Sequence, residues 1–177
     1  MIIWVNGAFG AGKTTLTEEL LRALPDAMQF DPEYVGYILI KWVPQPDSGD
    51  FQDIPLWRKL VADFAAGLAA EYGRPLIVPM TLVNPQYRAE IFERIEQSGQ
   101  RLLHVFLDVP EAELRRRIQA QVLVPEDGER DAEARAFRLR NVERCVAARV
   151  GLPDSTLVLS ADEYDPGQLA GLVLAAL

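Results

Sequence analysis

Closely spaced glycines near the N-terminus constrain this chain more than any other feature. Residues 7–14 read Gly-Ala-Phe-Gly-Ala-Gly-Lys-Thr and fit the P-loop pattern G-x-x-x-x-G-K-[ST]. An apolar run with strand propensity, residues 2–5, comes before them, and residues 15–21 follow with leucines at helical spacing. A P-loop requires this order of strand, glycine loop and helix. An ordinary glycine-rich turn, the alternative interpretation, requires neither flanking element.

Each part of this loop suits a polyphosphate. Gly7 and Gly12 permit a tight backbone path whose N–H groups point inward, and the helix that follows adds its positive N-terminal dipole. Lys13 would neutralise the β- and γ-phosphates, and the Thr14 hydroxyl would ligate Mg²⁺. The sequence therefore predicts ATP and Mg²⁺ as cofactors. The predicted nucleotide site comprises Gly7, Ala8, Phe9, Gly10, Ala11, Gly12, Lys13, Thr14 and Thr15.

Composition limits the partners. The chain has 177 residues, 49% of them hydrophobic, which predicts a single domain over residues 1–177. Its 26 acidic and 18 basic residues give a net charge of −8, which argues against non-specific nucleic-acid binding. The single cysteine, Cys145, excludes an internal disulfide and fits a reducing cytosol. Cys145 and the single histidine, His104, are both interpreted as packing residues.

No membrane-spanning segment is expected. No signal peptide is visible, and no apolar stretch reaches the roughly 20 residues that span a bilayer. The apolar C-terminal segment, residues 168–177, carries no Lys or Arg, so a helix packed on the sheet explains it better than a membrane-surface helix. The expected location is the cytoplasm.

Strand-like and helix-like segments alternate along the chain. This pattern predicts an α/β fold, a doubly wound parallel sheet with helices on both faces. Strands are expected at residues 2–5, 27–30, 76–78, 102–109 and 156–159. Helices are expected at residues 15–21, 56–72 and 85–97, from Pro110 onward, and at the C-terminus.

Two irregular stretches interrupt the alternation. Residues 41–55 are rich in proline and form a candidate acceptor loop. Residues 124–131 separate two arginine-rich helical segments and lie within a candidate small helical lid, residues 119–137. Long irregular segments in α/β domains often serve as lids or binding loops. A surface insertion without function is the alternative for each.

Other motifs narrow the class of P-loop protein. The guanine-reading Asn-Lys-x-Asp signature and the transporter ATPase signature are both absent. Residues 107–118 look like the nucleobase-side segment of small-molecule and nucleotide kinases. In those enzymes an arginine lies over the adenine, and Arg117 matches it. Gln121 stands one turn later, where a second arginine is usual.

Three arginines follow the candidate lid and suit a developing negative charge. Arg138, Arg140 and Arg144 lie on the returning helical segment, and the last two share one face. Mobile arginines that close over a γ-phosphate stabilise charge and exclude water. Arg144 is the first candidate for this catalytic role and Arg140 the second. The alternative is a solvated helix face paired with Glu133 or Glu143.

Asp31 is the candidate catalytic base. It follows the second expected strand, next to the P-loop strand, where its carboxylate would face the γ-phosphate. A carboxylate there accepts a proton from the acceptor hydroxyl or holds a metal-bound water, so Asp31 is also a candidate metal and substrate residue. A turn aspartate before Pro32 is the alternative.

Several segments together resemble the tunicamycin-resistance ATP-binding protein family. They are residues 2–10, 30–33 with Gly36, 43–45, 50–52, 55–58 and 77–81. The resemblance covers about the first 110 residues closely. It implies an ATP-binding protein of the nucleoside-monophosphate-kinase type that protects cells from tunicamycin, a nucleoside antibiotic with a fatty acyl chain. The family's C-terminal region, associated with membrane attachment, is shorter here, which leaves peripheral membrane association open.

The combined expectation is transfer of phosphoryl from ATP to a hydroxyl of a small acceptor, tunicamycin or a related nucleotide sugar. The predicted acceptor residues are Asp31, Glu33, Gln52, Trp57, Arg58 and Met80. For the apolar residues among them, simple core packing is the alternative. Two other functions stay open: sequestration of tunicamycin without chemistry, and a regulatory ATPase that acts with another protein.

Overall fold

A five-stranded parallel sheet forms the centre of the computed structural model, which describes residues 1–177. The strands are β1 (Ile2–Gly7), β2 (Met28–Gln29), β3 (Leu76–Pro79), β4 (Leu102–Asp108) and β5 (Leu157–Ser160). Their order is β2-β3-β1-β4-β5, and all neighbouring pairs are parallel. The predicted doubly wound α/β fold is therefore confirmed.

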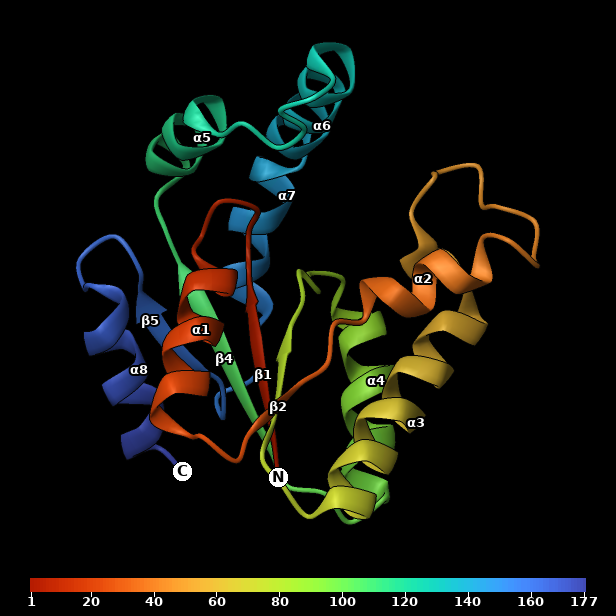
Figure 1. The fold of residues 1–177 in the computed structure, drawn as a ribbon, viewed down its shortest axis with the longest axis vertical. Coiled ribbons are helices and arrows are strands. Elements are labelled where there is room, and N and C mark those ends of the chain that lie inside the picture. Colours follow the sequence, from red (N-terminus) through yellow and green to blue (C-terminus); the bar gives the residue numbers. More distant parts are fainter.

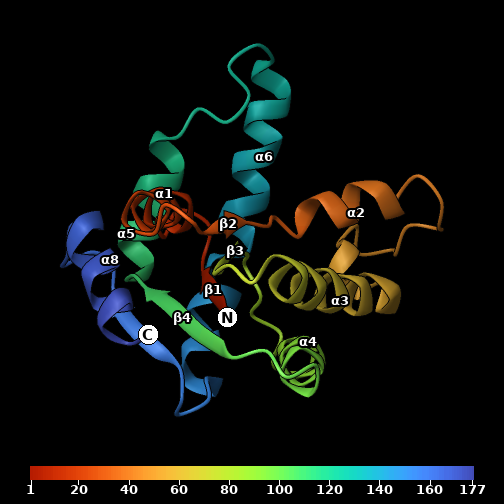
Figure 2. The same cartoon turned by 60° about the horizontal axis from the view of Figure 1, so that its bottom comes forward.

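Helices cover both faces of this sheet. They are α1 (Lys13–Ala23), α2 (Glu33–Leu39), α3 (Pro55–Tyr72), α4 (Pro85–Gln97), α5 (Glu111–Ala120), α6 (Gly128–Arg140), α7 (Val142–Ala147) and α8 (Pro166–Ala175). Short 3-10 helices occupy Phe51–Asp53 and Ala148–Gly151. Helices α1 and α8 lie on one side of the strands, and α3 and α4 lie on the other (Figures 1 and 2). Helices α5 and α6 rise beyond the end of β4 at the top of Figure 1.

The central strand β1 divides the apolar core into two parts. Ile3 and Val5 pack in a cluster with α1 and α8, whereas Ile2 and Trp4 pack in a cluster with α3 and α4. Successive side chains of a strand point to opposite faces, so a strand covered on both faces reads as a continuous apolar run. This packing holds the carboxyl end of β1, and hence the glycine loop, in a fixed place.

Helix α2 and the start of α6 differ from the sequence interpretation. Helix α2 occupies residues without an assigned element, and α6 already begins at Gly128, inside the expected loop 124–131. The Asp127 carboxylate accepts hydrogen bonds from the backbone N–H groups of Glu129 and Arg130. Aspartate before glycine resembles a turn in sequence but acts here as a helix N-cap. Pro110 likewise precedes α5 as its N-cap instead of being its first residue.

The C-terminal segment packs on the sheet as expected. Helix α8 begins with a capping box between Asp165 and Gln168. Its residues Leu169, Ala170 and Val173 are buried in the same cluster as the inner face of α1. No helix in the structure combines the length and apolar character needed to cross a membrane.

Candidate functional site

The glycine loop adopts a backbone that other residues cannot easily follow. Gly7 has φ 143° and Gly12 has φ 101°, in the region that L-residues avoid because of their Cβ atom. A Cβ on Gly7 would lie 3.0 Å from the carbonyl oxygen of Leu107 on the neighbouring strand β4. Helix α1 begins directly after Gly12, at Lys13. The loop therefore has the strand–loop–helix geometry that the motif predicted.

Lys13 lies across this loop. Its ammonium group donates hydrogen bonds to the carbonyl oxygens of Gly7, at 3.0 Å, and Ala8, at 2.9 Å. Burial lowers the pKa of Lys13 to about 8, because desolvation disfavours the charged form. At neutral pH the side chain still carries its positive charge at the mouth of the P-loop.

A cavity of about 680 Å³ opens beside the P-loop, at the carboxyl ends of the strands. Four parts of the chain line it: the P-loop with the start of α1, the segment after β2, the segment after β3, and helices α5 and α6. The lining residues include Lys13, Thr14, Asp31, Glu33, Met80, Thr81, Arg116, Arg117, Gln121 and Arg138. Open α/β sheets bind ligands at this edge.

Positive charge is concentrated in this cavity. Lys13 and three arginines line it together with only two carboxylates, Asp31 and Glu33, although the whole chain has a net charge of −8. Arg117 is held by hydrogen bonds to the Glu113 carboxylate, at 2.7 Å, and the Ala161 carbonyl, at 3.2 Å. Such a local excess of cations in a cleft attracts anionic ligands.

Asp31 both lines the cavity, as a catalytic carboxylate would, and forms a turn before α2, as the alternative interpretation expected. It lines the cavity with Lys13 and Thr14, and its Oδ1 atom also accepts a hydrogen bond from the Glu33 N–H at 2.9 Å. That turn fixes the orientation of the carboxylate. Glu33 lines the cavity as well, and its carboxylate accepts a hydrogen bond from the Tyr37 hydroxyl at 2.9 Å.

Two predicted acceptor residues are structural instead, which corrects the sequence interpretation. The Trp57 side chain is fully buried, and its indole N–H donates to the Pro32 carbonyl oxygen at 3.1 Å. Arg58 is also buried, pairs with Glu90 at 2.5 Å and lies over the Tyr87 ring. Neither side chain lines the P-loop cavity, so both are interpreted as residues that hold the fold together.

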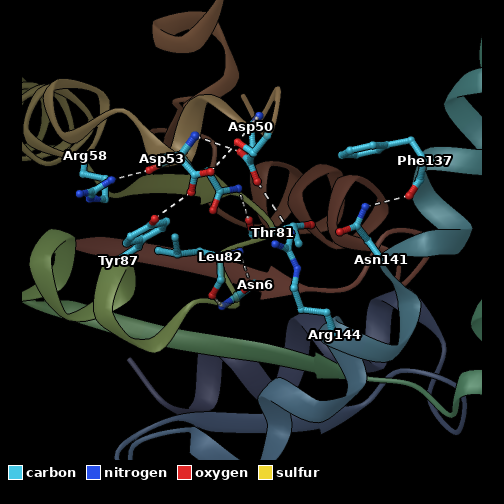
Figure 3. Close-up of polar contacts among 12 residues, drawn as sticks. Asn6, Asp50, Asp53, Arg58, Thr81, Leu82, Tyr87, Phe137, Asn141 and Arg144 are labelled. Atoms are coloured by element: carbon cyan, nitrogen blue, oxygen red, sulfur yellow. Dashed lines mark hydrogen bonds and ion pairs between the residues drawn. The ribbon is translucent and has the colours of Figure 1, made fainter. Parts of the chain in front are cut away.

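Gln52 likewise serves the loop between α2 and α3. Its side-chain amide nitrogen donates to the Thr81 carbonyl oxygen at 2.9 Å. Its backbone carbonyl oxygen accepts a hydrogen bond from the Arg58 guanidinium at 2.6 Å. In the same network Asp53 accepts a hydrogen bond from the Tyr87 hydroxyl at 2.8 Å (Figure 3). Gln52 thus fastens this loop to the segment after β3, where Thr81 lines the cavity.

The arginines on the lid side also differ from expectation. Arg140 lines a separate groove on α6 with Val124 and Glu133, and Arg144 forms an ion pair with Asp50 at 3.8 Å (Figure 3). Neither lines the P-loop cavity, but Arg138 does, and its guanidinium donates to Gln121 at 2.8 Å. Residues two positions apart on a helix point about 200° apart, so Arg138 replaces Arg140 as the α6 candidate.

Asn6 is a residue that the sequence interpretation missed. Its Oδ1 atom accepts from the backbone N–H groups of Gly7, at 2.7 Å, and Leu82, at 2.9 Å. Its amide nitrogen donates to the Leu82 carbonyl at 2.7 Å (Figure 3) and to His104 Nε2 at 3.2 Å. His104 Nδ1 therefore carries the proton and donates to Thr156 at 2.9 Å. The available sequence signal was a polar residue at the end of the apolar strand, directly before the first P-loop glycine.

His104 makes the stability of the fold depend on pH. Burial lowers its pKa from 6.5 to about 3, so in this range the unfolded chain binds a proton that the folded chain does not. Stability is then present above about pH 6.5 and is lost as the pH falls. Wild type should lose up to about 1.4 kcal/mol per pH unit more than His104→Gln between pH 6 and 5. Urea unfolding of both proteins measures this, and parallel pH profiles would contradict it.

Comparisons with known proteins agree with this geometry. A family model described as an AAA domain, AAA_33, matches residues 2–144, and no curated protein matches the chain. The tunicamycin resistance protein of Deinococcus radiodurans is similar in structure. It has a TM-score of 0.72 and 26% identity, over 99% of this chain and 94% of that one.

Two kinases have the same fold at lower identity. The APS kinase CysC of Mycobacterium tuberculosis, in complex with AMPPNP and APS, has a TM-score of 0.70 and 19% identity, over 98% of this chain and 95% of that one. A gluconokinase from Sinorhizobium meliloti 1021 has a TM-score of 0.62 and 18% identity, over 98% of this chain and 89% of that one.

These findings confirm the resemblance that the sequence motifs indicated. The family model covers the P-loop, the segments after β2 and β3, and the arginine-bearing helices α5 and α6. The similar structures include a tunicamycin resistance protein and small-molecule kinases with the same fold. This chain therefore belongs to the AAA_33 family of AAA domains and has the P-loop fold of small-molecule kinases.

Proposed function

We propose that this protein is an ATP- and Mg²⁺-dependent phosphotransferase that acts on a hydroxyl of a small nucleoside-type acceptor, tunicamycin or a related nucleotide sugar. One observation carries the proposal: the P-loop, two carboxylates and the arginines of α5 and α6 all line one cavity. Similarity to the Deinococcus radiodurans tunicamycin resistance protein supports this class of acceptor. The proposed location is the cytoplasm, where ATP and Mg²⁺ are available.

The donor set of the cavity fits Mg²⁺. The Thr14 hydroxyl and the Asp31 carboxylate are oxygen ligands that line the same space, and the structure has no cluster of three or more metal-ligating side chains. Mg²⁺ in kinase sites takes one or two protein ligands and completes its shell with phosphates and water. When bound, it would neutralise negative charge on the phosphates.

The remaining residues divide the work of transfer. Lys13 and the inward N–H groups of the P-loop would bind the β- and γ-phosphates. Arg117 lies on the α5 side, where the nucleobase would enter, and Arg138 approaches from α6. Asp31 would accept the proton of the acceptor hydroxyl. Met80 lines the cavity in the segment after β3 but is only 4% exposed, so it would contribute only a small apolar contact to the acceptor.

Acceptor-dependent release of ADP tests this function. Protein with Mg-ATP and tunicamycin should form ADP steadily, at a rate that saturates with tunicamycin, while ATP alone should turn over much more slowly. Lid closure around the correct acceptor completes a kinase site and excludes water. ATP binding with no tunicamycin-dependent ADP would favour sequestration instead.

A matched pair on α6 tests the placement of the arginines. Arg138→Ala should lower the transfer rate by about 10²-fold, because it removes a cation that stabilises developing phosphate charge. Arg140→Ala should stay within about 2-fold of wild type, because Arg140 lies in the outer groove and exposed charges matter little. Steady-state kinetics measure both. The reverse order of effects would restore Arg140 as the catalytic arginine.

Hydrogen exchange tests the proposed lid, residues 119–137. Helices α5 and α6 present cavity arginines from either side of this segment. Binding of Mg-ATP should draw them together and slow amide exchange within residues 119–137. Helix α8, which packs against α1 and contributes no residue to the cavity lining, serves as the internal control. Equal exchange with and without Mg-ATP across the lid would contradict closure.

A further inference from the structure

A second cavity, of about 270 Å³, lies apart from the P-loop. It is formed by α4, the first half of β4 and the segment before β5, and it shares no lining residue with the P-loop cavity. Its lining includes the buried residues Arg88, Phe92 and His104, the half-buried Leu102 and the exposed Pro153 and Ser155. Two exposed carboxylates of α4, Glu93 and Glu96, line it as well. The proposed phosphotransferase reaction uses none of these residues.

Arg88 is a buried cation without an anionic partner. It is only 6% exposed, and none of the ion pairs in the structure includes it. The single hydrogen bond of its side chain runs from Nη2 to the Gly151 carbonyl oxygen, at 2.6 Å. The only fully enclosed side-chain polar atoms without a partner belong to Trp4 and Thr17. The remaining N–H groups of Arg88 are therefore accessible from the cavity that it lines.

A charge in this position calls for a counter-ion. Burial of an unpaired charge is costly, and proteins normally pair such charges. The His104 ring, which lines the same cavity, is neutral because of its lowered pKa, and both of its nitrogens are already hydrogen-bonded to Asn6 and Thr156. Glu93 and Glu96 also line the cavity, but both are exposed and neither forms an ion pair with Arg88. An anionic ligand on Arg88 would provide a directly paired counter-charge.

The other walls define the chemistry of that ligand. A carboxylate matches the planar fork of a guanidinium with two parallel hydrogen bonds. Phe92, Leu102 and Pro153 form an apolar surface beside it, which suits a small hydrocarbon body. The carboxylates of Glu93 and Glu96, which also line the cavity, would repel a doubly charged phosphate more strongly than a singly charged carboxylate.

We propose that this cavity is a binding site for a small organic monocarboxylate. The carboxylate group would lie on Arg88 and the apolar body against Phe92, Leu102 and Pro153. Ser155 supplies a hydroxyl for a further hydrogen bond. Binding at this site does not require ATP. It can therefore be tested separately from the phosphotransferase function.

The single histidine of the chain is a built-in reporter. His104 lines the cavity, so its imidazole signals in ¹⁵N- and ¹³C-labelled protein should shift when the cavity fills. Titration with benzoate should give a saturable shift in wild type. Arg88→Met should abolish saturation, whereas Arg94→Met, on the exposed part of the same helix and paired with Asp63, should leave it unchanged. Inorganic phosphate should produce no saturable shift.

A second variant tests the site even if Arg88→Met fails to fold. Ala89 lines the cavity and is itself exposed, so Ala89→Phe should fill the space while leaving Arg88 and the core in place. It should weaken benzoate binding at least tenfold with an unchanged thermal transition. Absence of saturation in wild type, equal binding by Ala89→Phe, or binding of phosphate in preference to benzoate would overturn the proposal.

Discussion

Replacement of Lys13 with alanine should weaken Mg-ATP binding and lower phosphoryl transfer by about 10² to 10³-fold, the cost of losing one preorganised group at a developing charge. The ammonium lies at the mouth of the P-loop, 2.9 and 3.0 Å from two loop carbonyls. No other lysine lines the cavity. Its removal leaves phosphate charge to Arg138, Arg117 and the backbone. Calorimetry with Mg-ATP and steady-state kinetics measure the two effects.

Lys59→Ala is the matched control for this experiment. Lys59 is exposed on α3, so its loss changes the net charge equally without touching the cavity, and Mg-ATP affinity should stay at the wild-type value. The fold should survive in both variants, because the Lys13 side chain makes no ion pair in the structure. Unchanged Mg-ATP affinity in Lys13→Ala would contradict the assignment of the P-loop as the ATP-binding site.

Asp31→Asn should separate catalysis from binding. The amide keeps the shape of the side chain, and its oxygen can still accept the Glu33 N–H that Asp31 Oδ1 accepts now. Affinity for Mg-ATP should therefore hold or rise slightly, because a negative charge leaves the cavity. Loss of a general base typically costs about 10² to 10⁴-fold in rate, and transfer should fall by that factor.

Asp26→Asn, in an exposed position before β2, is the control for charge alone and should behave like wild type. In cells, Asp31→Asn at equal protein level should lose resistance to tunicamycin. Full resistance in that variant would contradict the kinase mechanism and favour sequestration, which needs no base.

The P-loop and the layered fold could be predicted because they depend on local patterns. Glycine spacing with Lys13 and Thr14 specifies the loop chemistry, and Leu76–Pro79 is a continuous apolar run, as a strand buried on both faces requires. Helix α4 was expected at residues 85–97 and is found there. In the structure Asn84 caps its N-terminus and Pro85 occupies its first turn.

Which polar side chains line the cavity and which only stabilise the fold could not be predicted in the same way. Arg58 resembles a binding residue in sequence, but its partner Glu90 is 32 residues away and only the packing of α3 on α4 brings them together. Arg138 and Arg140 lie on one helix. Which of them faces the P-loop depends on how α6 packs over the cavity. Such long-range choices have no local sequence signal.

Mass spectrometry of tunicamycin incubated with wild-type protein and Mg-ATP detects the proposed phosphoryl transfer directly. We expect a product heavier than tunicamycin by one phosphoryl group, in amounts that exceed the protein many times, with little product from Lys13→Ala or Asp31→Asn. Unmodified tunicamycin after long incubation, with protein that still binds both Mg-ATP and the drug, would contradict it.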